Sequence, residues 1–377
     1  MSDKFLPDES EVSVRLKTLD AEKAGETSHV DHRWSTTIYS SSDIYQSERN
    51  SLAGKSPLCL GFVHELDSSP HSYVIREIWN TPWIVCRTAN GGLAAFLNRC
   101  RHRGMRLLEN AKGLCKKIVC PYHGWTYDDT GACVAIPQKA AAFPDLDLQS
   151  VRLESRRVAE HGGLLWILPD GYSEDLSEQF FGPLAKHFAA WGLNTYELRS
   201  SQTYDVSANW KILQEAFLEA YHVPFIHRAT LAPATRSFSW LLDFYGPHSR
   251  AVYPLKRLSQ DPDLKKAPLR RYTSVVYHVF PNTLISFQPF HALVSRFMPS
   301  APDKTRAHIS VLVRPEDAKN FSELVSKDID FVTKGLLEDF STAEKIQAGL
   351  AAGPDEFRAG SYEVQIPHFH KHLNSVQ

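Results

Sequence analysis

The sequence contains no long apolar segment. None of its uninterrupted apolar runs approaches the ~18 residues that a membrane-spanning helix requires. The first residues, MSDKFLPDESEVSVRLK, also lack the apolar core of a secretory signal peptide. We therefore expect a cytoplasmic protein that does not enter a membrane.

An excess of charge of one sign is also missing. Lysine and arginine total 42, aspartate and glutamate total 43, and the net charge is −1 at pH 7. Proteins that bind nucleic acid or an anionic membrane surface usually carry a basic patch, so neither partner is expected. The chain has 377 residues, which suggests about two domains at ~150 residues each.

Cysteine is scarce, with six residues in the chain, and a cytosolic location argues against a disulfide framework. Two of the six stand close to a histidine, in the pairs Cys100–His102 and Cys120–His123. We expect the others to be plain buried or partly buried thiols: Cys59, Cys86, Cys115 and Cys133.

Two cysteines and two histidines suit either a structural zinc ion or a [2Fe–2S] cluster of the Rieske type. A zinc finger usually pairs cysteine with cysteine and histidine with histidine. Here each pair is mixed, so each of two loops can give one ligand to each of two irons. Gly104 and Gly124 follow the histidines closely, as expected where the backbone turns tightly near a cluster. The order of residues favours the cluster.

The stretches CRHRG and CPYHGWTYDDTG resemble the Rieske signature of the Rieske non-haem iron oxygenases. The resemblance implies a [2Fe–2S] cluster on Cys100, His102, Cys120 and His123. Trp125 and Tyr127 follow the second loop, and we expect them to pack over the cluster.

The pattern of short runs predicts an α+β protein with two domains. Residues 1–40 have no clear periodicity and are expected to be a flexible arm, followed by a helix of the catalytic domain within 41–56. Residues 57–169 read as a small antiparallel β domain that carries the cluster. Residues 170–377 read as a catalytic domain, an antiparallel sheet covered by helices of the helix-grip type. Within it, 209–222 reads as a helix, four turn-bounded runs between 273 and 313 read as strands, and 317–353 reads as a long helix. Residues 230–268 read as a long irregular insertion, of a kind that is usually functional or mobile.

His222 and His227 lie five residues apart, so they do not share a helix face. Pro224 between them predicts a bend that brings both imidazoles to one point. The run from NWK to the second histidine resembles the catalytic motif of the oxygenase large subunit, in which two histidines and one carboxylate hold Fe(II). The resemblance places the carboxylate at Asp339 on the last long helix, with Glu338 as its competitor.

Glu219 occupies the position of the family's bridging carboxylate, which connects a cluster histidine of one subunit to an iron-ligand histidine of the next. Many members carry aspartate here, whereas carnitine-oxygenase-like relatives carry glutamate. The resemblance also implies a homotrimer, O2 as co-substrate, and electrons from NAD(P)H through a separate flavin or iron–sulfur reductase, in some systems with a ferredoxin.

Several functions fit this pattern. We expect monohydroxylation, with or without loss of an N- or O-alkyl group, of a small polar substrate such as a quaternary ammonium or carboxylated compound. Cis-dihydroxylation of an aromatic ring is the alternative, and a Rieske electron carrier or a zinc-stabilised binding protein are alternatives from other classes. Candidate substrate contacts are aromatic residues for an ammonium group and arginines for a carboxylate: Phe238, Trp240, Phe244, Tyr245, Tyr253, Tyr272 and Phe287, and Arg236, Arg250 and Arg271.

Overall fold

The computed structural model describes residues 6–19, 31–261 and 266–376. The chain divides into two compact units, one formed by residues 53–175 and one that joins residues 1–52 to 176–377. The N-terminal segment thus folds with the C-terminal half. Within the described ranges, no helix has the length and apolar character needed to cross a bilayer.

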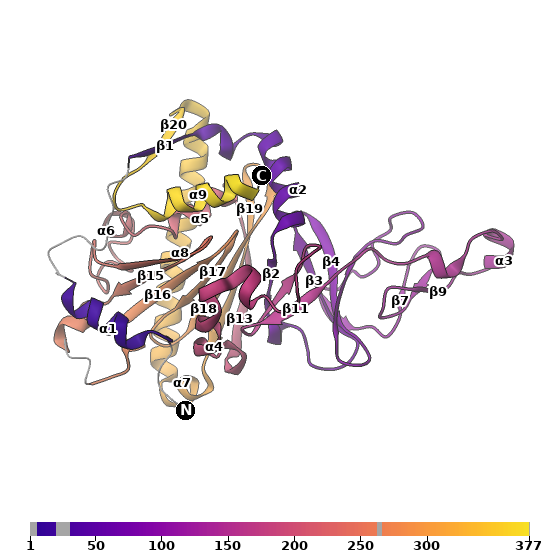
Figure 1. The fold of residues 1–377 in the computed structure, drawn as a ribbon, viewed down its shortest axis with the longest axis horizontal. Helices are drawn as coiled ribbons and strands as arrows, with labels where there is room; N and C mark the ends of the chain where they lie inside the picture. The colour runs from indigo at the N-terminus through magenta and orange to yellow at the C-terminus, as the bar shows by residue number, and fades with distance from the viewer. Residues whose placement is uncertain (1–5, 20–30, 262–265, 377) are drawn as a thin grey trace. The chain divides into compact units, whose positions relative to one another are not determined.

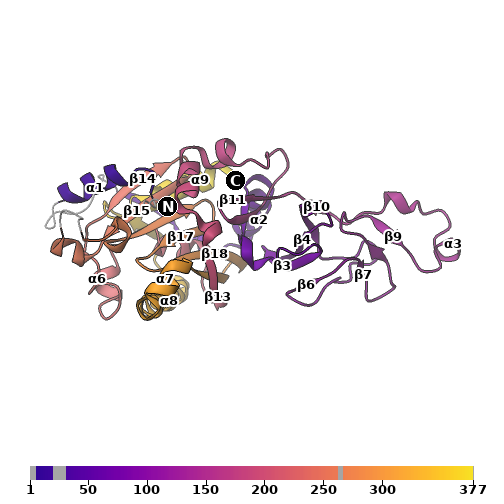
Figure 2. The same ribbon diagram turned by 90° about the horizontal axis from the view of Figure 1, so that it is seen from below.

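The smaller unit is built from antiparallel strands, as the sequence predicts. Its largest sheet has the order β10-β5-β4-β3-β6, and two three-stranded sheets have the orders β11-β12-β2 and β7-β8-β9. Figure 2 shows β3, β4 and β10 of the larger sheet lying together. The strands are β2 (Leu58–Phe62), β3 (Ser72–Ile78), β4 (Thr81–Arg87), β5 (Leu93–Leu97), β6 (Lys112–Leu114), β7 (Ile118–Val119), β8 (Thr126–Tyr127), β9 (Cys133–Ala135), β10 (Ser155–Arg156), β11 (Val158–His161) and β12 (Leu164–Ile167).

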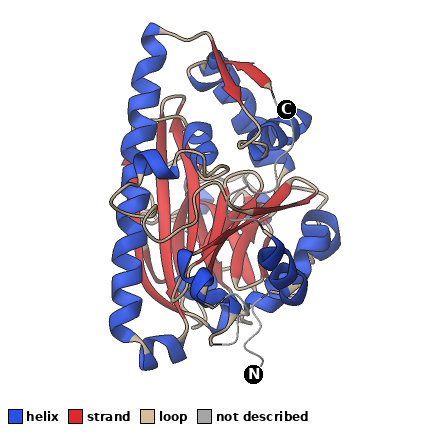
Figure 3. Ribbon diagram, turned by 90° about the vertical axis from the view of Figure 1, so that its left-hand side faces the viewer, coloured by secondary structure: helices blue, strands red, loops and turns tan. Residues whose placement is uncertain are grey.

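The larger unit is organised by a seven-stranded antiparallel sheet in the order β13-β19-β18-β17-β16-β15-β14. Six of its strands, β14 to β19, lie in the sheet in their order along the chain, which suits the turn-bounded spacing of the sequence. Figures 1 and 3 show the long helix α8 (Ser322–Gly349) running along this sheet. The strands are β13 (Glu197–Val206), β14 (Leu241–Tyr245), β15 (His248–Pro254), β16 (Thr273–Val279), β17 (Thr283–Phe287), β18 (Ala292–Ala301) and β19 (Lys304–Val313).

Helix α8 packs on the sheet because its apolar residues recur at helical spacing. Leu336, Phe340 and Ala343 on this helix are buried in one cluster with Phe297 and Ile309 from β18 and β19. The short helix α5 (Trp210–Ala216) adds to the same cluster. The core therefore fixes α5 and α8 against one sheet, although more than a hundred residues separate them in sequence.

The segment 230–268 differs from its expected form as an irregular insertion. It contains β14 and β15, which are the edge and second strands of the large sheet. The two strands form a hairpin in which Tyr245 is opposite His248, with Gly246 at φ +59° between them. Glycine at the first position of a two-residue turn is a hairpin signal, and the surrounding aromatic residues and prolines obscured it.

The expected flexible arm over residues 1–40 also differs in its described parts. Helix α1 (Glu9–Thr18) lies in the first described range, and β1 (His32–Ser35) in the second range pairs with β20 (Glu356–Ala359). The guanidinium of Arg250, which is fully buried, donates two hydrogen bonds to the carboxylate of Asp8, at 2.8 and 2.7 Å. A buried cation needs such a partner, so the arm is held by a residue that lies far away in sequence.

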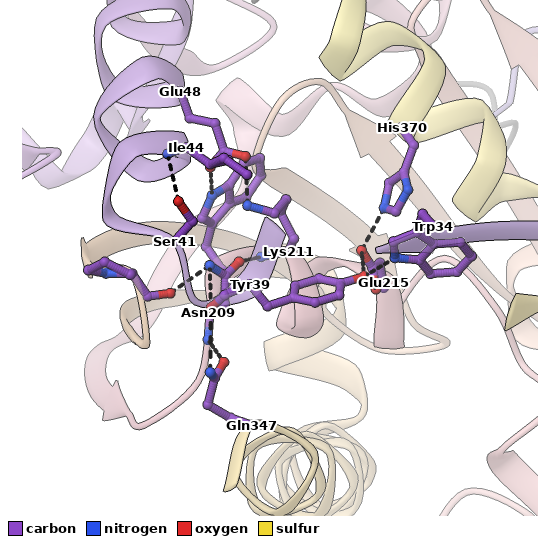
Figure 4. A network of polar contacts seen from close by, with 12 residues as sticks. Trp34, Tyr39, Ser41, Ile44, Glu48, Asn209, Lys211, Glu215, Gln347 and His370 are labelled. Carbon is purple, nitrogen blue, oxygen red and sulfur yellow. Dashed lines mark hydrogen bonds and ion pairs between the residues drawn. The ribbon is translucent and has the colours of Figure 1, made fainter. Parts of the chain in front are cut away.

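A buried ion pair fixes the start of α5. Lys211 Nζ donates to Glu48 Oε1 at 2.6 Å, and both side chains are almost fully buried. Glu48 belongs to α2 (Ser42–Lys55), and its second oxygen accepts from Trp210 Nε1 at 3.0 Å. Figure 4 shows the pair of Glu48 and Lys211.

A second set of polar contacts fixes the end of α5. Glu215 accepts from Tyr39 Oη at 2.7 Å and contacts His370 Nε2 at 2.7 Å. Trp34 Nε1 donates to Tyr39 Oη at 2.6 Å (Figure 4). Burial and the neighbouring Glu215 carboxylate raise the pKa of Tyr39 well above its usual range. The phenol therefore stays protonated and keeps donating to Glu215, which ties the N-terminal segment and α9 (Gln365–Val376) to α5.

Candidate metal centres

The two Cys-His loops have the same backbone turn. Cys100 N donates to Met105 O at 2.8 Å, and Cys120 N donates to Trp125 O, also at 2.8 Å. Within each loop a glycine N–H donates back to the cysteine carbonyl at 3.0 Å. These glycines, at 104 and 124, have φ values of +74° and +70°, which residues with a Cβ rarely adopt.

The loops place the two predicted cluster histidines beside each other and the two predicted cluster cysteines beside each other. The rings of His102 and His123 have their centroids 4.7 Å apart. Burial raises the pKa of the Cys100 thiol, and the neighbouring Cys120 thiol adds to this increase. The two imidazoles are therefore neighbours, and so are the two thiols, as a cluster with two ligands on each iron requires.

Aromatic residues surround these loops. The indole of Trp125 stacks on His102 with 4.9 Å between centroids and 4° between planes. Tyr127 Oη lies 3.2 Å from Cys100 Sγ and accepts a hydrogen bond from Arg101 N at 3.1 Å. The expectation that both residues pack here is confirmed. The other four cysteines are free thiols, three of them buried and Cys115 half-buried, as expected.

The second candidate centre lies in the larger unit. The predicted helix over 209–222 ends early, because α5 stops at Ala216, and a short helix α6 (Val223–Ile226) begins after His222. Pro224 stands in the first turn of α6, where proline fits without loss of a hydrogen bond. The turn between the helices, together with Pro224, gives the change of direction that the sequence attributed to proline alone.

His222, His227 and Asp339 converge on one point. Their candidate ligand atoms all lie within 4.8 Å of one another. His227 Nε2 is 2.9 Å from Asp339 Oδ1, and His222 Nε2 is 3.4 Å from the same oxygen. The two Nε2 atoms are 3.2 Å apart. Two imidazoles and one carboxylate on one side of a point form the donor set that suits non-haem Fe(II).

Each of the two histidines has a second carboxylate on its other ring nitrogen. His222 Nδ1 contacts Glu219 Oε1, and His222 N donates to Glu219 Oε2 at 3.1 Å. His227 Nδ1 lies 2.7 Å from Glu338 Oε2. Metal-binding histidines usually donate their remaining N–H in this way, which fixes the tautomer. Glu338, the competitor of Asp339, therefore lies behind His227 rather than beside it.

The electrostatics of this group favour a cation. Burial opposes protonation of His222, but the carboxylates of Asp339 and Glu219 outweigh it and raise its pKa to about 10. Burial likewise opposes protonation of His227, and Asp339 and Glu338 raise its pKa. Asp339 is buried, yet the two histidines keep its pKa below the usual value. The two imidazoles therefore favour a positive charge, and Asp339 stays ionised beside them. This arrangement fits a divalent cation.

A cavity of about 180 Å³ opens beside the three residues. Of the seven aromatic residues proposed from the sequence, Phe238 and Tyr253 line this cavity, and the other five are not part of its described lining. Two aromatic lining residues, Phe217 and Phe331, were not predicted. They lie on elements that read as ordinary core helices, so the sequence carried no signal for them.

The three predicted arginines are used differently. Arg236 lines the cavity. Arg250 is paired with Asp8 and Asp243, and Arg271 with Asp317, so the expectation that these two hold a substrate is wrong. Arg257 lines the cavity instead. It follows β15 in the segment that read as an irregular insertion, so its place beside the cavity could not be predicted.

The comparisons with known families cover both units. Residues 56–152 match the model of the Rieske [2Fe-2S] domain, and residues 193–376 match the ring hydroxylating alpha subunit (catalytic domain). These domains bind a Rieske cluster and a mononuclear iron, respectively.

Curated relatives include oxygenase subunits of two kinds. The chain is 35% identical over 213 residues to the chlorobenzene dioxygenase subunit alpha of Cupriavidus sp. (strain PS12), which covers 55% of this chain and 45% of the relative. It is 26% identical over 363 residues to the glycine betaine monooxygenase oxygenase subunit of Chromohalobacter salexigens, covering 85% and 80%. The chain spans about half the length of the first curated relatives it matches.

Solved structures share the fold. The quaternary ammonium Rieske monooxygenase CntA in complex with gamma-butyrobetaine has a TM-score of 0.75 at 20% identity, covering 93% of this chain and 96% of that one. Naphthalene 1,2-dioxygenase from Rhodococcus sp. has a TM-score of 0.72 at 21% identity, covering 91% and 94%. With both domains matched in order, the chain belongs to the Rieske non-haem iron oxygenases as an alpha subunit.

Proposed function

We propose that this chain is the terminal oxygenase of a multicomponent system, and that it monohydroxylates a small polar substrate, with N- or O-dealkylation where the hydroxylated carbon bears a heteroatom. One observation carries the proposal: His222, His227 and Asp339 surround a point that opens into a cavity, in a chain that also carries a Rieske domain. An electron carrier has no need of a second metal-binding set beside a cavity.

In this proposal His222, His227 and Asp339 hold the mononuclear iron, and Cys100, His102, Cys120 and His123 hold the cluster. Iron bound at the first site supplies the activation of O2. The protein's own part is to hold and orient. Glu219 and Glu338 accept the Nδ1–H bonds of the two histidines, so both rings present Nε2 to the metal.

Glu219 has a second proposed role, as the electron link to a cluster histidine of a neighbouring subunit in a homotrimer. Its contact with His222 places it one hydrogen bond from a proposed iron ligand. The electrons would come from NAD(P)H through a separate reductase, as in the family.

Relatives named for quaternary ammonium compounds, such as the carnitine monooxygenase subunit of Acinetobacter baumannii, at 28% identity over 186 residues, support a small polar substrate. Aromatic cis-dihydroxylation is the second candidate. It is favoured by the identity of 35% to the chlorobenzene dioxygenase subunit and by the phenyl rings of Phe217, Phe238 and Phe331 in the cavity lining.

The experiment is a metal and sulfide count on anaerobically reconstituted protein, with an EPR spectrum after reduction by dithionite. We expect about three irons and two sulfides per chain, the sum of one two-iron cluster and one iron, and about two irons for His222→Ala. O2 consumption with a surrogate reductase then reports turnover. Two irons in the parent after reconstitution would favour the electron carrier, and zinc without sulfide would reject both metal assignments.

A further inference from the structure

One face of α8 lines the cavity beside the proposed iron site. Asp328, Phe331, Val332, Leu336 and Asp339 all line it, and they recur at the three- and four-residue spacing of a single helix face. From Asp328 to Asp339 there are 11 residues (339 − 328), or ~16 Å of helix at 1.5 Å per residue. An apolar stretch therefore separates the iron ligand from a charged far end.

Two arginines belong to that far end. Arg257 lies near Asp328, whose charge acts on it. Arg236 Nη2 donates to Ser259 Oγ at 2.7 Å, so its tip lies beside the turn η7 (Lys256–Gln260) that carries Arg257. Both side chains line the cavity. Two segments that are 21 positions apart in sequence thus bring two guanidinium groups to one end of it.

The two guanidinium groups have unused hydrogen-bonding capacity. Within residues 6–19, 31–261 and 266–376, Arg236 Nε is buried without a hydrogen-bond partner, and no hydrogen bond or ion pair to Arg257 is found. Burial lowers the pKa of Arg257. Asp328 supplies only partial neutralisation, because its Oδ2 already accepts from Phe290 N at 3.1 Å and from His291 Nδ1 at 2.9 Å.

Apart from Asp339 and Glu219, which engage the histidines, the charged lining residues are therefore two cations and one carboxylate. A partly buried cation without an anion at hydrogen-bonding distance is costly, and an incoming carboxylate removes that cost. Guanidinium groups bind carboxylates through paired N–H donors. The site has the chemistry of a receptor for one negative charge.

We infer that Arg236 and Arg257 bind a carboxylate of the substrate at the end of the cavity remote from His222, His227 and Asp339. The substrate class is then an elongated monocarboxylate, with several bonds between the anionic group and the carbon that reacts. This inference rests on the proposed function and makes it more specific, because it selects the carboxylated substrates from those considered.

The test is calorimetric binding of matched probes to the metal-loaded protein kept free of O2. Straight-chain carboxylates of four to ten carbons are compared with their primary amides, which have the same shape without the charge. We expect the longer carboxylates to bind at least tenfold more tightly than their amides. Arg236→Gln and Arg257→Gln should each remove most of that preference and leave amide binding unchanged, while Arg257→Lys should retain part of it.

Arg306→Gln is the control, because Arg306 pairs with Asp205 on the exposed side of the sheet. It should bind both probes as the parent does. Equal affinity for acid and amide, an unchanged preference in both glutamine variants, or no carboxylate binding at millimolar concentration would overturn the inference. None of these readouts depends on turnover. A failed iron count would reject the proposed function, whereas a failed binding test would reject only the arginine assignment.

Discussion

The two candidate centres are encoded in opposite ways. The cluster residues lie within one stretch of 24 residues, from Cys100 to His123, and two loops with matching turns present them. The second centre combines His222 and His227 with Asp339, which is 112 positions further along the chain. The first centre thus depends on local backbone geometry, and the second depends on how α8 packs against the sheet.

The two centres also differ in the solvent exposure of their side chains. His123 is exposed and His102 half-buried, and the neighbouring Tyr122 is 56% exposed. His227 is fully buried and Asp339 is 6% exposed. A group that exchanges electrons with a partner has to lie near a surface, whereas a group that activates O2 has to be shielded from water. The difference therefore fits the two roles proposed.

The largest expected effect is at the second centre, formed by His222, His227 and Asp339. Asp339→Ala should abolish mononuclear iron binding and O2 consumption, because two histidines alone leave the donor set incomplete, while the cluster spectrum stays intact. Iron counting with EPR measures both. Glu338→Ala is the matched control, and it should retain the site with iron affinity weakened roughly 10–100-fold. If Glu338→Ala lost iron and Asp339→Ala kept it, the assignment of the ligand would be reversed.

The reciprocal change is Cys120→Ser, which should abolish the visible absorption and the EPR signal of the cluster, because a required thiolate is missing. The mononuclear iron should remain, since its ligands belong to the other unit. Cys115→Ser is the control, because this half-buried thiol lies outside the predicted ligand set and donates to Lys117 O at 3.0 Å. Simultaneous loss of both metals in Cys120→Ser would show that the centres do not form independently.

The third prediction tests whether the buried ion pair of Glu48 and Lys211 stabilises the fold around α5, the helix that precedes His222. Glu48→Gln leaves the buried Lys211 without its anion, and it should lower the free energy of unfolding by about 3–5 kcal/mol. Denaturant unfolding of parent and variant measures this. Adding Lys211→Met should recover most of the loss, because methionine has no charge that needs an anion and the amide oxygen at position 48 can still accept from Trp210 Nε1. If the single variant matched the parent, the ion pair would not fix α5.

A smaller effect is the loss of folding stability at low pH that His248 causes. His248 is fully buried, Nε2 lies 2.8 Å from Phe180 O, and Nδ1 accepts from Phe280 N at 3.1 Å, so there is no room for a second proton. Burial lowers its pKa to about 4. The unfolded chain, with a pKa near 6.5, binds the proton first. Stability is therefore complete above pH ~6.5 and falls as the pH drops toward 4, by on the order of 3 kcal/mol.

Denaturant midpoints between these pH values measure the slope. His248→Gln keeps a donor for Phe180 O and cannot titrate, so its slope should be shallower than that of the parent. Metal ligands are the same in both proteins, and their contribution cancels in the difference. Equal slopes would contradict the account.

The smallest effect is expected at the first centre, the predicted cluster site. The phenol oxygen of Tyr127 accepts a hydrogen bond from Arg101 N. The phenol proton is therefore directed at Cys100 Sγ. Tyr127→Phe removes a hydrogen bond that stabilises the more negative, reduced cluster. Its reduction potential should fall by tens of millivolts, where ~59 mV is a tenfold change for one electron. Tyr122→Phe, at an exposed ring, should leave the potential unchanged in the same redox titration.

Much of the fold could be predicted from the sequence. The strands β16–β19 follow the sequence because turn residues bound each short β-rich run, and α8 follows it because apolar residues recur at helical spacing. The hairpin of β14 and β15 was missed, because its strands lie among aromatic residues and prolines that read as an irregular insertion. The early end of α5 was missed as well, since Phe217 and Tyr221 continue the helical spacing beyond the helix.

The sequence by itself determined the cluster loops, because residues a few positions apart with glycines at fixed places need only a local turn to meet. It also indicated the two histidines at 222 and 227. Only the tertiary structure decided that Asp339 faces the point between them, that Glu338 lies behind His227, and that Arg257 rather than Arg250 reaches the cavity. The physical reason is that adjacent residues on a helix or strand point in different directions, and packing against distant elements selects which one meets the site.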